Sequence, residues 1–130
     1  MARVRSRDTA PELVVRRAAH AIGLRFRLHR RDLPGRPDLI FPRYRLVLFV
    51  HGCYWHRHSG CRRATSPKTN TLFWEAKFAA NIARDRAAID QLAQAGWRTL
   101  VIWECETRHE TEVKARLLAF LSPAPLRPDP

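Results

Sequence analysis

The chain has 130 residues, 45% of them hydrophobic, which suits one domain with a modest core. Its 24 Lys and Arg residues outnumber 12 Asp and Glu residues, so the formal net charge is +12 and the basic surface favours nucleic acid as a partner. The chain has three cysteines, no signal-type apolar segment, no lipidation motif and no bilayer-length apolar run, which argues against secreted disulfide frameworks and membrane proteins and predicts a cytoplasmic location.

The first half of the chain predicts one helix and three strands. Thr9 is a suitable N-cap before Pro11, and apolar residues recur at helical spacing until Gly23 ends the run. Hydrophobic alternation and continuous apolar runs then predict strands over three segments: Leu24–Leu28, Leu39–Phe41 and Arg45–Val50. The last of these is apolar almost throughout, as in a central strand buried on both faces.

The second half predicts a helix, a strand and a final helix: Thr71–Ala95, Thr99–Trp103 and Thr111–Leu121. We therefore expect an α/β fold with a central mixed β-sheet flanked by α-helices. The predicted domain covers residues 1–121, including a short N-terminal arm at 1–8. The Pro-rich tail, 122–130, has too little apolar content to fold and is expected to be disordered.

Five metal-binding or proton-transfer side chains stand within eleven residues, at His51, Cys53, His56, His58 and Cys61. Cys53, His58 and Cys61 follow a C-x4-H-x2-C pattern, which lets two thiolates and an imidazole converge on a tetrahedral zinc ion. Cys105 would complete a structural Cys3His site by holding a distant segment against this loop. The alternative is a cluster of buried thiols and exposed histidines without a metal, but the spacing favours zinc.

Acidic and histidine residues are expected to meet at one edge of the sheet, where α/β folds place their sites. Asp38 precedes one strand, His51 and His56 follow another, and Glu104 follows a third. Asp38 could simply cap its own turn. Beside a basic surface, its carboxylate suggests a Mg²⁺ ion held partly by water and phosphate oxygens, and His56 could then take a proton from the attacking water.

The long helix carries further candidates. Asp85 could orient His56 as a carboxylate does in a catalytic triad, although a carboxylate beside two arginines is more often a surface ion pair. Lys77 and Arg84 on the same helix are candidates for DNA contacts. Three aromatic residues near these polar groups either pack in the core or stack on and wedge between bases: Tyr54, Trp55 and Trp74.

Eight ordered blocks over roughly residues 7–106 resemble the very-short-patch repair DNA mismatch endonucleases: Asp8–Glu12, Leu33–Asp38, Val50–His56, Pro67–Asn70, Phe73–Trp74, Asn81–Asp85, Gly96–Trp97 and Trp103–Cys105. The resemblance implies a restriction-endonuclease-like fold. It also implies Mg²⁺-dependent nicking of one DNA strand 5′ to the thymine of a T:G mismatch, which arises when 5-methylcytosine deaminates. We further expect a monomer, associated with the nucleoid when bound to double-stranded DNA, with mismatch-repair proteins as partners.

The resemblance also implies roles by position. Asp38 matches a metal-binding aspartate, with the backbone carbonyl of Val50 as a second Mg²⁺ ligand. His56 and Asp85 match a proton-transfer pair. Further matches are active-site positions (His51 and Glu12), structural zinc ligands (Cys53, His58, Cys61 and Cys105) and aromatic residues that wedge beside the mismatch (Tyr54, Trp55 and Trp74).

Two departures from the family pattern stand out. Only eight residues precede Thr9, whereas family members usually carry a longer arm that grips DNA, so we expect weaker affinity or mismatch specificity. Val50 replaces a threonine found in some relatives, which a backbone ligand tolerates. Two alternatives stay open: a nuclease of the same fold with another specificity, and a zinc-stabilised DNA-binding module without catalysis. The presence of Asp38, His56 and Asp85 favours the enzyme.

Overall fold

The computed structural model describes residues 9–28 and 30–121, so the expected arm at 1–8 and tail at 122–130 lie outside the described residues. The elements follow in the order α1 (Ala10–Ala21), β1 (Arg27–Leu28), β2 (Leu39–Phe41), η1 (Pro42–Tyr44), β3 (Leu46–His51), α2 (Thr71–Gln94), β4 (Arg98–Trp103), η2 (Glu104–Thr107) and α3 (Glu110–Leu121). The two short 3-10 helices, η1 and η2, were not predicted. Among the described helices, none combines the length and the apolar content that crossing a membrane requires.

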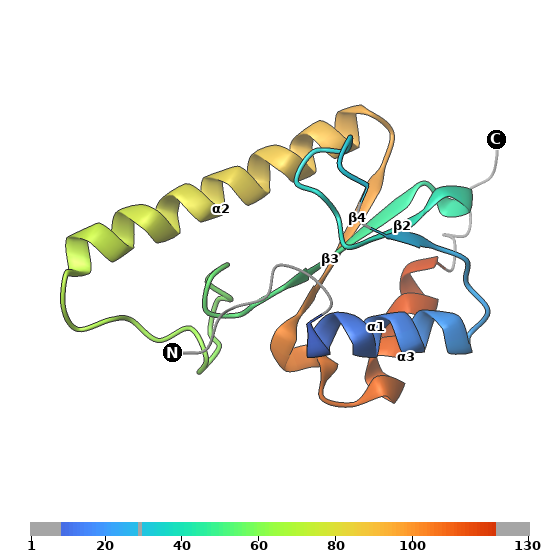
Figure 1. Ribbon diagram of the computed structural model, residues 1–130, viewed down its shortest axis with the longest axis horizontal. Coiled ribbons are helices and arrows are strands. Elements are labelled where there is room, and N and C mark those ends of the chain that lie inside the picture. The colour runs from blue at the N-terminus through green and yellow to red at the C-terminus, as the bar shows by residue number, and fades with distance from the viewer. Residues whose placement is uncertain (1–8, 29, 122–130) are drawn as a thin grey trace.

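A four-stranded mixed sheet forms the centre of the molecule, as predicted, and its strand order is β1-β2-β3-β4 (Figure 1). β2 runs antiparallel to β3, whereas β4 runs parallel to it. The start of β2 and the ends of β3 and β4 therefore meet at one edge of the sheet. Leu39 pairs with Leu48 at that edge, and His51 pairs with Trp103.

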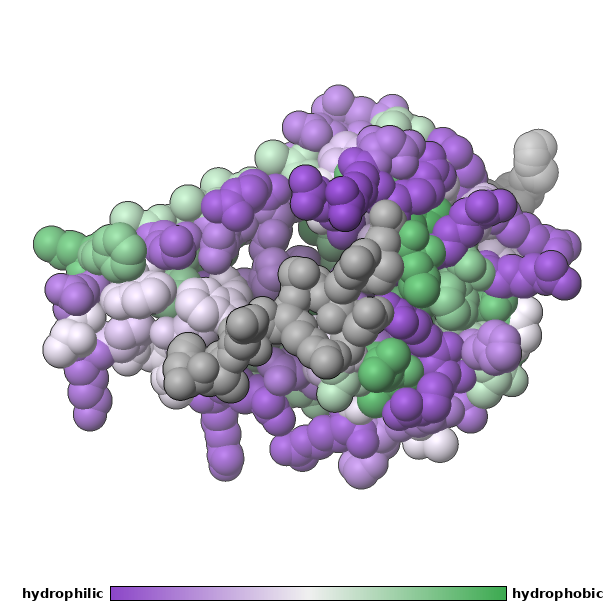
Figure 2. All heavy atoms as spheres, viewed as in Figure 1, coloured by the Kyte–Doolittle hydropathy of each residue, from purple (hydrophilic) through white to green (hydrophobic). Residues whose placement is uncertain are grey.

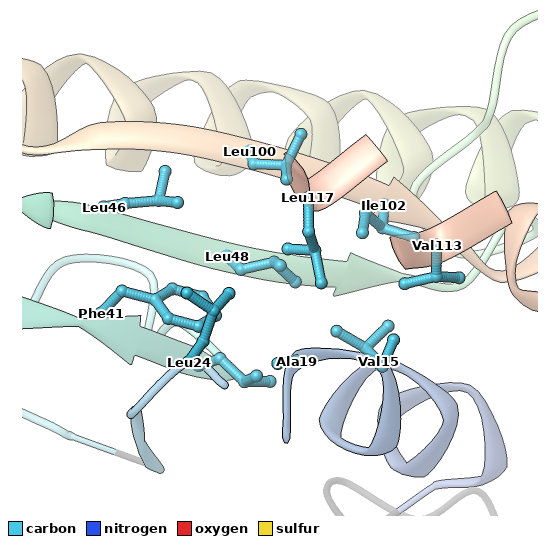
Figure 3. Close-up of a cluster of buried hydrophobic side chains, with 12 residues drawn as sticks. Val15, Ala19, Leu24, Phe41, Leu46, Leu48, Leu100, Ile102, Val113 and Leu117 are labelled. Atoms are coloured by element: carbon cyan, nitrogen blue, oxygen red, sulfur yellow. The ribbon is translucent and has the colours of Figure 1, made fainter. Parts of the chain in front are cut away.

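Helices cover both faces of the sheet, which confirms the predicted flanking layers. α1 and α3 lie together on one face, and α2 lies on the other (Figure 1). β3 alternates between the two cores: Leu46 and Leu48 pack with α1 and α3 (Figure 3), whereas Val47 and Phe49 pack with the C-terminal part of α2. Each of these large side chains contributes roughly 1.5–3 kcal/mol by leaving water, so β3 is the strand on which both cores depend.

The N-terminal half of α2 extends beyond the sheet (Figure 1). Of the 24 residues of this helix, all of them described, only Phe78 and Leu92 are buried. Leu72 and Phe73 are 81% and 60% exposed, and Figure 2 shows apolar side chains gathered at this free end of the helix. The predicted helix is present, but half of its length lies outside the main core.

The structure corrects the predicted bounds of two strands. The predicted strand over Leu24–Leu28 contributes only Arg27–Leu28 to the sheet, because Leu24 is buried against the helices and its N–H donates to Ala19 at the end of α1. The predicted strand over Arg45–Val50 instead covers Leu46–His51. Arg45 has a left-handed backbone with φ 50° and closes η1, while His51 pairs with β4 and is the last residue of the strand.

Candidate active site and metal centre

The turn before β2 fixes the position of Asp38. Gly35 has φ +74°, and a β-carbon there would lie 2.7 Å from the Cβ of Ala88, so glycine lets the turn pack against α2. The Asp38 N–H donates to the Leu48 carbonyl at 2.9 Å, and the Val50 N–H donates to Asp38 Oδ2 at 2.6 Å. Both bonds join Asp38 to β3, so its carboxyl group is held beside the end of that strand.

Glu12 brings a second carboxyl group to Asp38. It lies on α1, is only 4% exposed and pairs with Arg16 at 3.5 Å. Burial, with a smaller contribution from the neighbouring Glu12 carboxyl group, raises the pKa of Asp38 to about 7, although the bond from Val50 and the charge of Arg16 oppose the rise. A half-buried carboxylate that is costly to ionise beside another carboxyl group is a suitable place for a hard cation.

Two histidines stack next to this carboxyl pair. His51 ends β3, directly after Val50, and its ring lies 3.9 Å from that of His56 with an interplanar angle of 4°. His56 Nδ1 lies 2.7 Å from Asp85 Oδ2 on α2. Because an ionised carboxylate only accepts hydrogen bonds, we assign the proton of His56 to Nδ1, which leaves Nε2 with a free lone pair. The structure thus pairs Asp85 with His56.

Burial keeps His51 uncharged at neutral pH. Burial and, to a smaller extent, the charge of His56 lower the pKa of His51 to about 4, and Asp85 opposes this shift. The stacked pair therefore contains one neutral imidazole, at His51, which does not repel a proton gained by His56.

The four predicted zinc ligands come together, although Cys105 is 44 positions beyond Cys61 in the chain. One ligand atom from each of Cys53, His58, Cys61 and Cys105 lies within 4.8 Å of all the others. The Cys105 N–H donates to Cys53 Sγ at 3.4 Å, and Cys105 Sγ lies 3.5 Å from His58 Nδ1. The His58 ring stacks on Trp103 at 4.3 Å. This cluster could hold one metal ion.

The cluster does not ionise all its thiols by itself. Burial raises the pKa of Cys53 to about 12, and burial also raises the pKa of Cys105. The pKa of Cys61 is lowered, chiefly by the backbone N–H of Arg63. A bound metal ion would supply the positive charge that keeps the Cys53 and Cys105 thiols ionised.

Four aromatic side chains form a cluster between the ligand loop, residues 52–65, and α2. We call Tyr54, Trp55, Trp74 and Phe78 the aromatic cluster; their ring centroids lie 4.9–6.4 Å apart in the contacting pairs. Phe78 is buried, whereas Trp55 is 37% exposed. The cluster is therefore part core and part surface. Lys77 and Arg84 are both exposed on α2.

Three residues near the site had no role in the sequence prediction. Arg57 donates to three carbonyl groups of the ligand loop, and Asn81 Nδ2 donates to the Trp55 carbonyl at 3.2 Å. Arg16 pairs with Glu12, which a spacing of four residues on a helix could have indicated. Glu104 follows β4 as predicted, and its carboxylate pairs with Arg63 at 3.4 Å.

The chain is similar to several known DNA endonucleases. Residues 1–63 match the family model described as DNA mismatch endonuclease Vsr. The type II nicking enzyme V.XorIIP of Xanthomonas oryzae pv. oryzae is 52% identical over 124 residues, which cover 95% of this chain and 90% of that protein. The DNA mismatch endonuclease Vsr of Escherichia coli is 44% identical over 108 residues, 83% of this chain and 69% of that protein. The type II nicking enzyme V.NmeAIP of Neisseria meningitidis is 36% identical over 117 residues, 90% and 83% of the two chains.

Proposed function

Because the chain belongs to the DNA mismatch endonuclease Vsr family and is a DNA endonuclease, we propose that it nicks one strand of duplex DNA 5′ to the thymine of a T:G mismatch in a Mg²⁺-dependent reaction. The observation that carries this proposal is the adjacency of two pairs at one sheet edge. Asp38 with Glu12 offers a cation site, and His56 with Asp85 offers a proton acceptor. The mixed sheet with helices on both faces also suits the restriction-endonuclease-like fold, which we propose for the single domain.

The donor set at the sheet edge fits a hard cation. The Asp38 carboxylate and the backbone carbonyl of Val50 would hold Mg²⁺, which prefers such oxygen ligands and completes its shell with water and phosphate oxygens. When bound, Mg²⁺ supplies charge stabilisation for the scissile phosphate. The raised pKa of Asp38 fits this role, because a cation relieves the cost of ionising the carboxyl group.

His56 is the residue that accepts the proton of the attacking water in this proposal. The Asp85 carboxylate holds Nδ1–H at 2.7 Å, which aims the free Nε2 lone pair away from α2 and stabilises the imidazolium that forms. Stacking on His51 restricts the ring to one plane. The intact pair supports an active enzyme over a silent DNA-binding module.

The aromatic cluster is proposed to read the mismatch. Trp55 is 37% exposed and so accessible to DNA, and its ring lies against those of Tyr54 and Trp74. An aromatic wedge costs least to insert where base stacking is already weak, as at a mismatch. Lys77 and Arg84, exposed on α2, are proposed to contact DNA phosphates.

A strand-specific nicking assay tests the function. Duplexes carrying T:G, T:A or C:G at one position, within randomised flanking sequence, are labelled on one strand at a time. We expect cleavage 5′ to the thymine of T:G, only on that strand and only with Mg²⁺ present. A chelator should stop cleavage, because it removes the cation that stabilises the charge of the scissile phosphate. Equal cleavage of the matched duplexes would instead indicate a nuclease of another specificity. Binding without cleavage of any duplex would indicate the silent module.

The Cys53, His58, Cys61 and Cys105 cluster is proposed to be a structural zinc site. A zinc–sulfur bond of about 2.3 Å and a zinc–nitrogen bond of about 2.0 Å at the tetrahedral angle place the two ligand atoms about 3.5 Å apart. Cys105 Sγ and His58 Nδ1 lie 3.5 Å apart, which fits such a site. Four protein ligands leave no open position for substrate, so the ion would hold η2 against the ligand loop.

Metal analysis of the purified protein is expected to find one zinc atom per chain. Cys105→Ser should lose the metal and melt several degrees below the parent, because zinc binding contributes to folding free energy only while the site is complete. His20→Ser, at an exposed histidine of α1, is the matched control and should keep both zinc and stability. A Cys105→Ser variant as stable as the parent would rule out the structural zinc site.

A further inference from the structure

Arg57 joins both ends of the ligand loop to α2. Its backbone has φ 56°, in the left-handed region. Its Nη1 donates to the Tyr54 carbonyl at 3.1 Å and to the Thr65 carbonyl at 3.0 Å, and its Nη2 donates to the Ala64 carbonyl at 3.2 Å. The guanidinium group also lies 4.0 Å from the ring centre of Phe78 and 5.2 Å from that of Tyr54.

This geometry needs arginine in particular. A planar guanidinium group can donate to several carbonyls in its plane while its face stacks on an aromatic ring, whereas a lysine ammonium group is a compact charge that cannot do both. Phe78 is buried and fixed on α2, so it is the anchor of the contact. Because Arg57 bonds the Tyr54 carbonyl, it holds the backbone from which Tyr54 and Trp55 project.

Open space lies beside Arg57. A pocket of about 300 Å³ is lined by Arg57, Trp74 and Phe78 together with neighbouring residues of α2 and the ligand loop. Without the guanidinium group, the loop and the rings of Tyr54 and Trp55 would gain room to move toward this pocket. A wedge that must first become ordered binds DNA more weakly than a preorganised one.

We propose that Arg57 is a positioning residue that holds Tyr54 and Trp55 in the conformation in which they enter the mismatched duplex. The proposal rests on the proposed function for its DNA step, but its structural step concerns the free protein. The donors of Nη1 and Nη2 are directed at loop carbonyls and one face is covered by Phe78, so Arg57 acts through the loop and not as a phosphate contact.

Arg57→Lys is the test, with Arg62→Lys as the matched control, because it makes the same change at an exposed arginine of the same loop. In the free protein, the indole N–H resonance of Trp55 should shift or broaden in Arg57→Lys, while zinc content and melting midpoint stay close to those of the parent. With DNA, the preference for T:G over T:A duplexes should fall about tenfold, since roughly one stacking contact is lost. The salt dependence of binding should not change, since the charge is kept.

A parent-like Trp55 resonance and T:G preference in Arg57→Lys would overturn the proposal. So would an equal loss of affinity for both duplexes with a smaller salt dependence, which would mark Arg57 as a phosphate contact. If Arg57→Lys loses zinc or unfolds, Phe78→Leu is the second test, because it removes the ring on which the guanidinium group stacks but keeps the arginine. A parent-like Trp55 resonance and T:G preference in Phe78→Leu would reject the positioning role of Arg57. Loss of zinc or of folding in both variants also rejects it. A parent protein without T:G preference would refute the proposed function, while the Trp55 resonance still tests positioning.

Discussion

Replacing Asp38 by asparagine is expected to abolish strand nicking and, in the same protein, to stabilise the metal-free state. Nicking is lost because the neutral amide does not supply the negative charge that holds Mg²⁺. Losing several kcal/mol of charge stabilisation should lower the nicking rate by a factor on the order of 10³ or more. DNA binding should survive, since removing a carboxylate lessens repulsion of phosphate. Cleavage rates and DNA affinity, measured side by side, separate these two effects.

The gain in stability follows from the raised pKa of Asp38. In the folded protein this carboxyl group holds its proton up to about pH 7, whereas in the unfolded chain it ionises near the ordinary value of 3.8. Between these pH values the folded state binds more protons, so rising pH destabilises the parent. The asparagine of Asp38→Asn does not ionise. The free energy of unfolding of this variant should therefore exceed that of the parent by an amount that grows from pH 4 to a plateau above pH 7. The shift of about three pKa units corresponds to an upper value of about 4 kcal/mol.

Thermal unfolding across this pH range, with and without Mg²⁺, checks the prediction. Mg²⁺ should stabilise the parent above pH 7 and leave Asp38→Asn unchanged, because only the parent binds it tightly. Asp32→Asn makes the same change at an exposed residue, bonded to Arg30 at 2.6 Å, and should keep full nicking. An Asp38→Asn protein less stable than the parent above pH 7 would contradict the raised pKa of Asp38.

Replacing His56 by alanine is expected to slow nicking on the order of 10²–10⁴-fold at saturating DNA, because the attacking water then has no positioned proton acceptor. The free energy of unfolding should change less than the activation free energy of nicking, since the His56 side chain is about one-third exposed. Single-turnover cleavage isolates the chemical step from binding and product release. A rate within a few-fold of the parent would remove His56 from the reaction.

The partner Asp85 should act through His56. Asp85→Asn is expected to lose part of the same factor, since an amide can hold the ring but does not stabilise the imidazolium. The double variant should be little slower than His56→Ala alone, because two residues that work as a unit give non-additive losses. Asp90→Asn, at an exposed aspartate of the same helix, is the control. Additive losses would show that Asp85 acts independently.

Several features of this protein follow from local sequence alone. The N-cap at Thr9, the apolar run Leu46–Val50 of the central strand and the long helix before Gly96 are set by hydrogen-bonding residues, hydrophobic periodicity and glycine, all of which act over a few residues. Soft ligands at short spacing also indicated the metal cluster before any fold was known, because three of its four members lie within nine residues.

Tertiary structure decided which of these residues face one another. Sequence patterns predicted a mixed sheet but not that β2 runs antiparallel and β4 parallel to β3, which is the arrangement that brings Asp38 to Val50 and Cys105 to Cys53. The pairing of Asp85 with His56 required α2 to cross one particular face, and periodicity does not specify a face. The role of Arg57 was hidden for the same reason: its hydrogen-bond partners are backbone carbonyls, which every residue carries, so no pattern of side chains could reveal them.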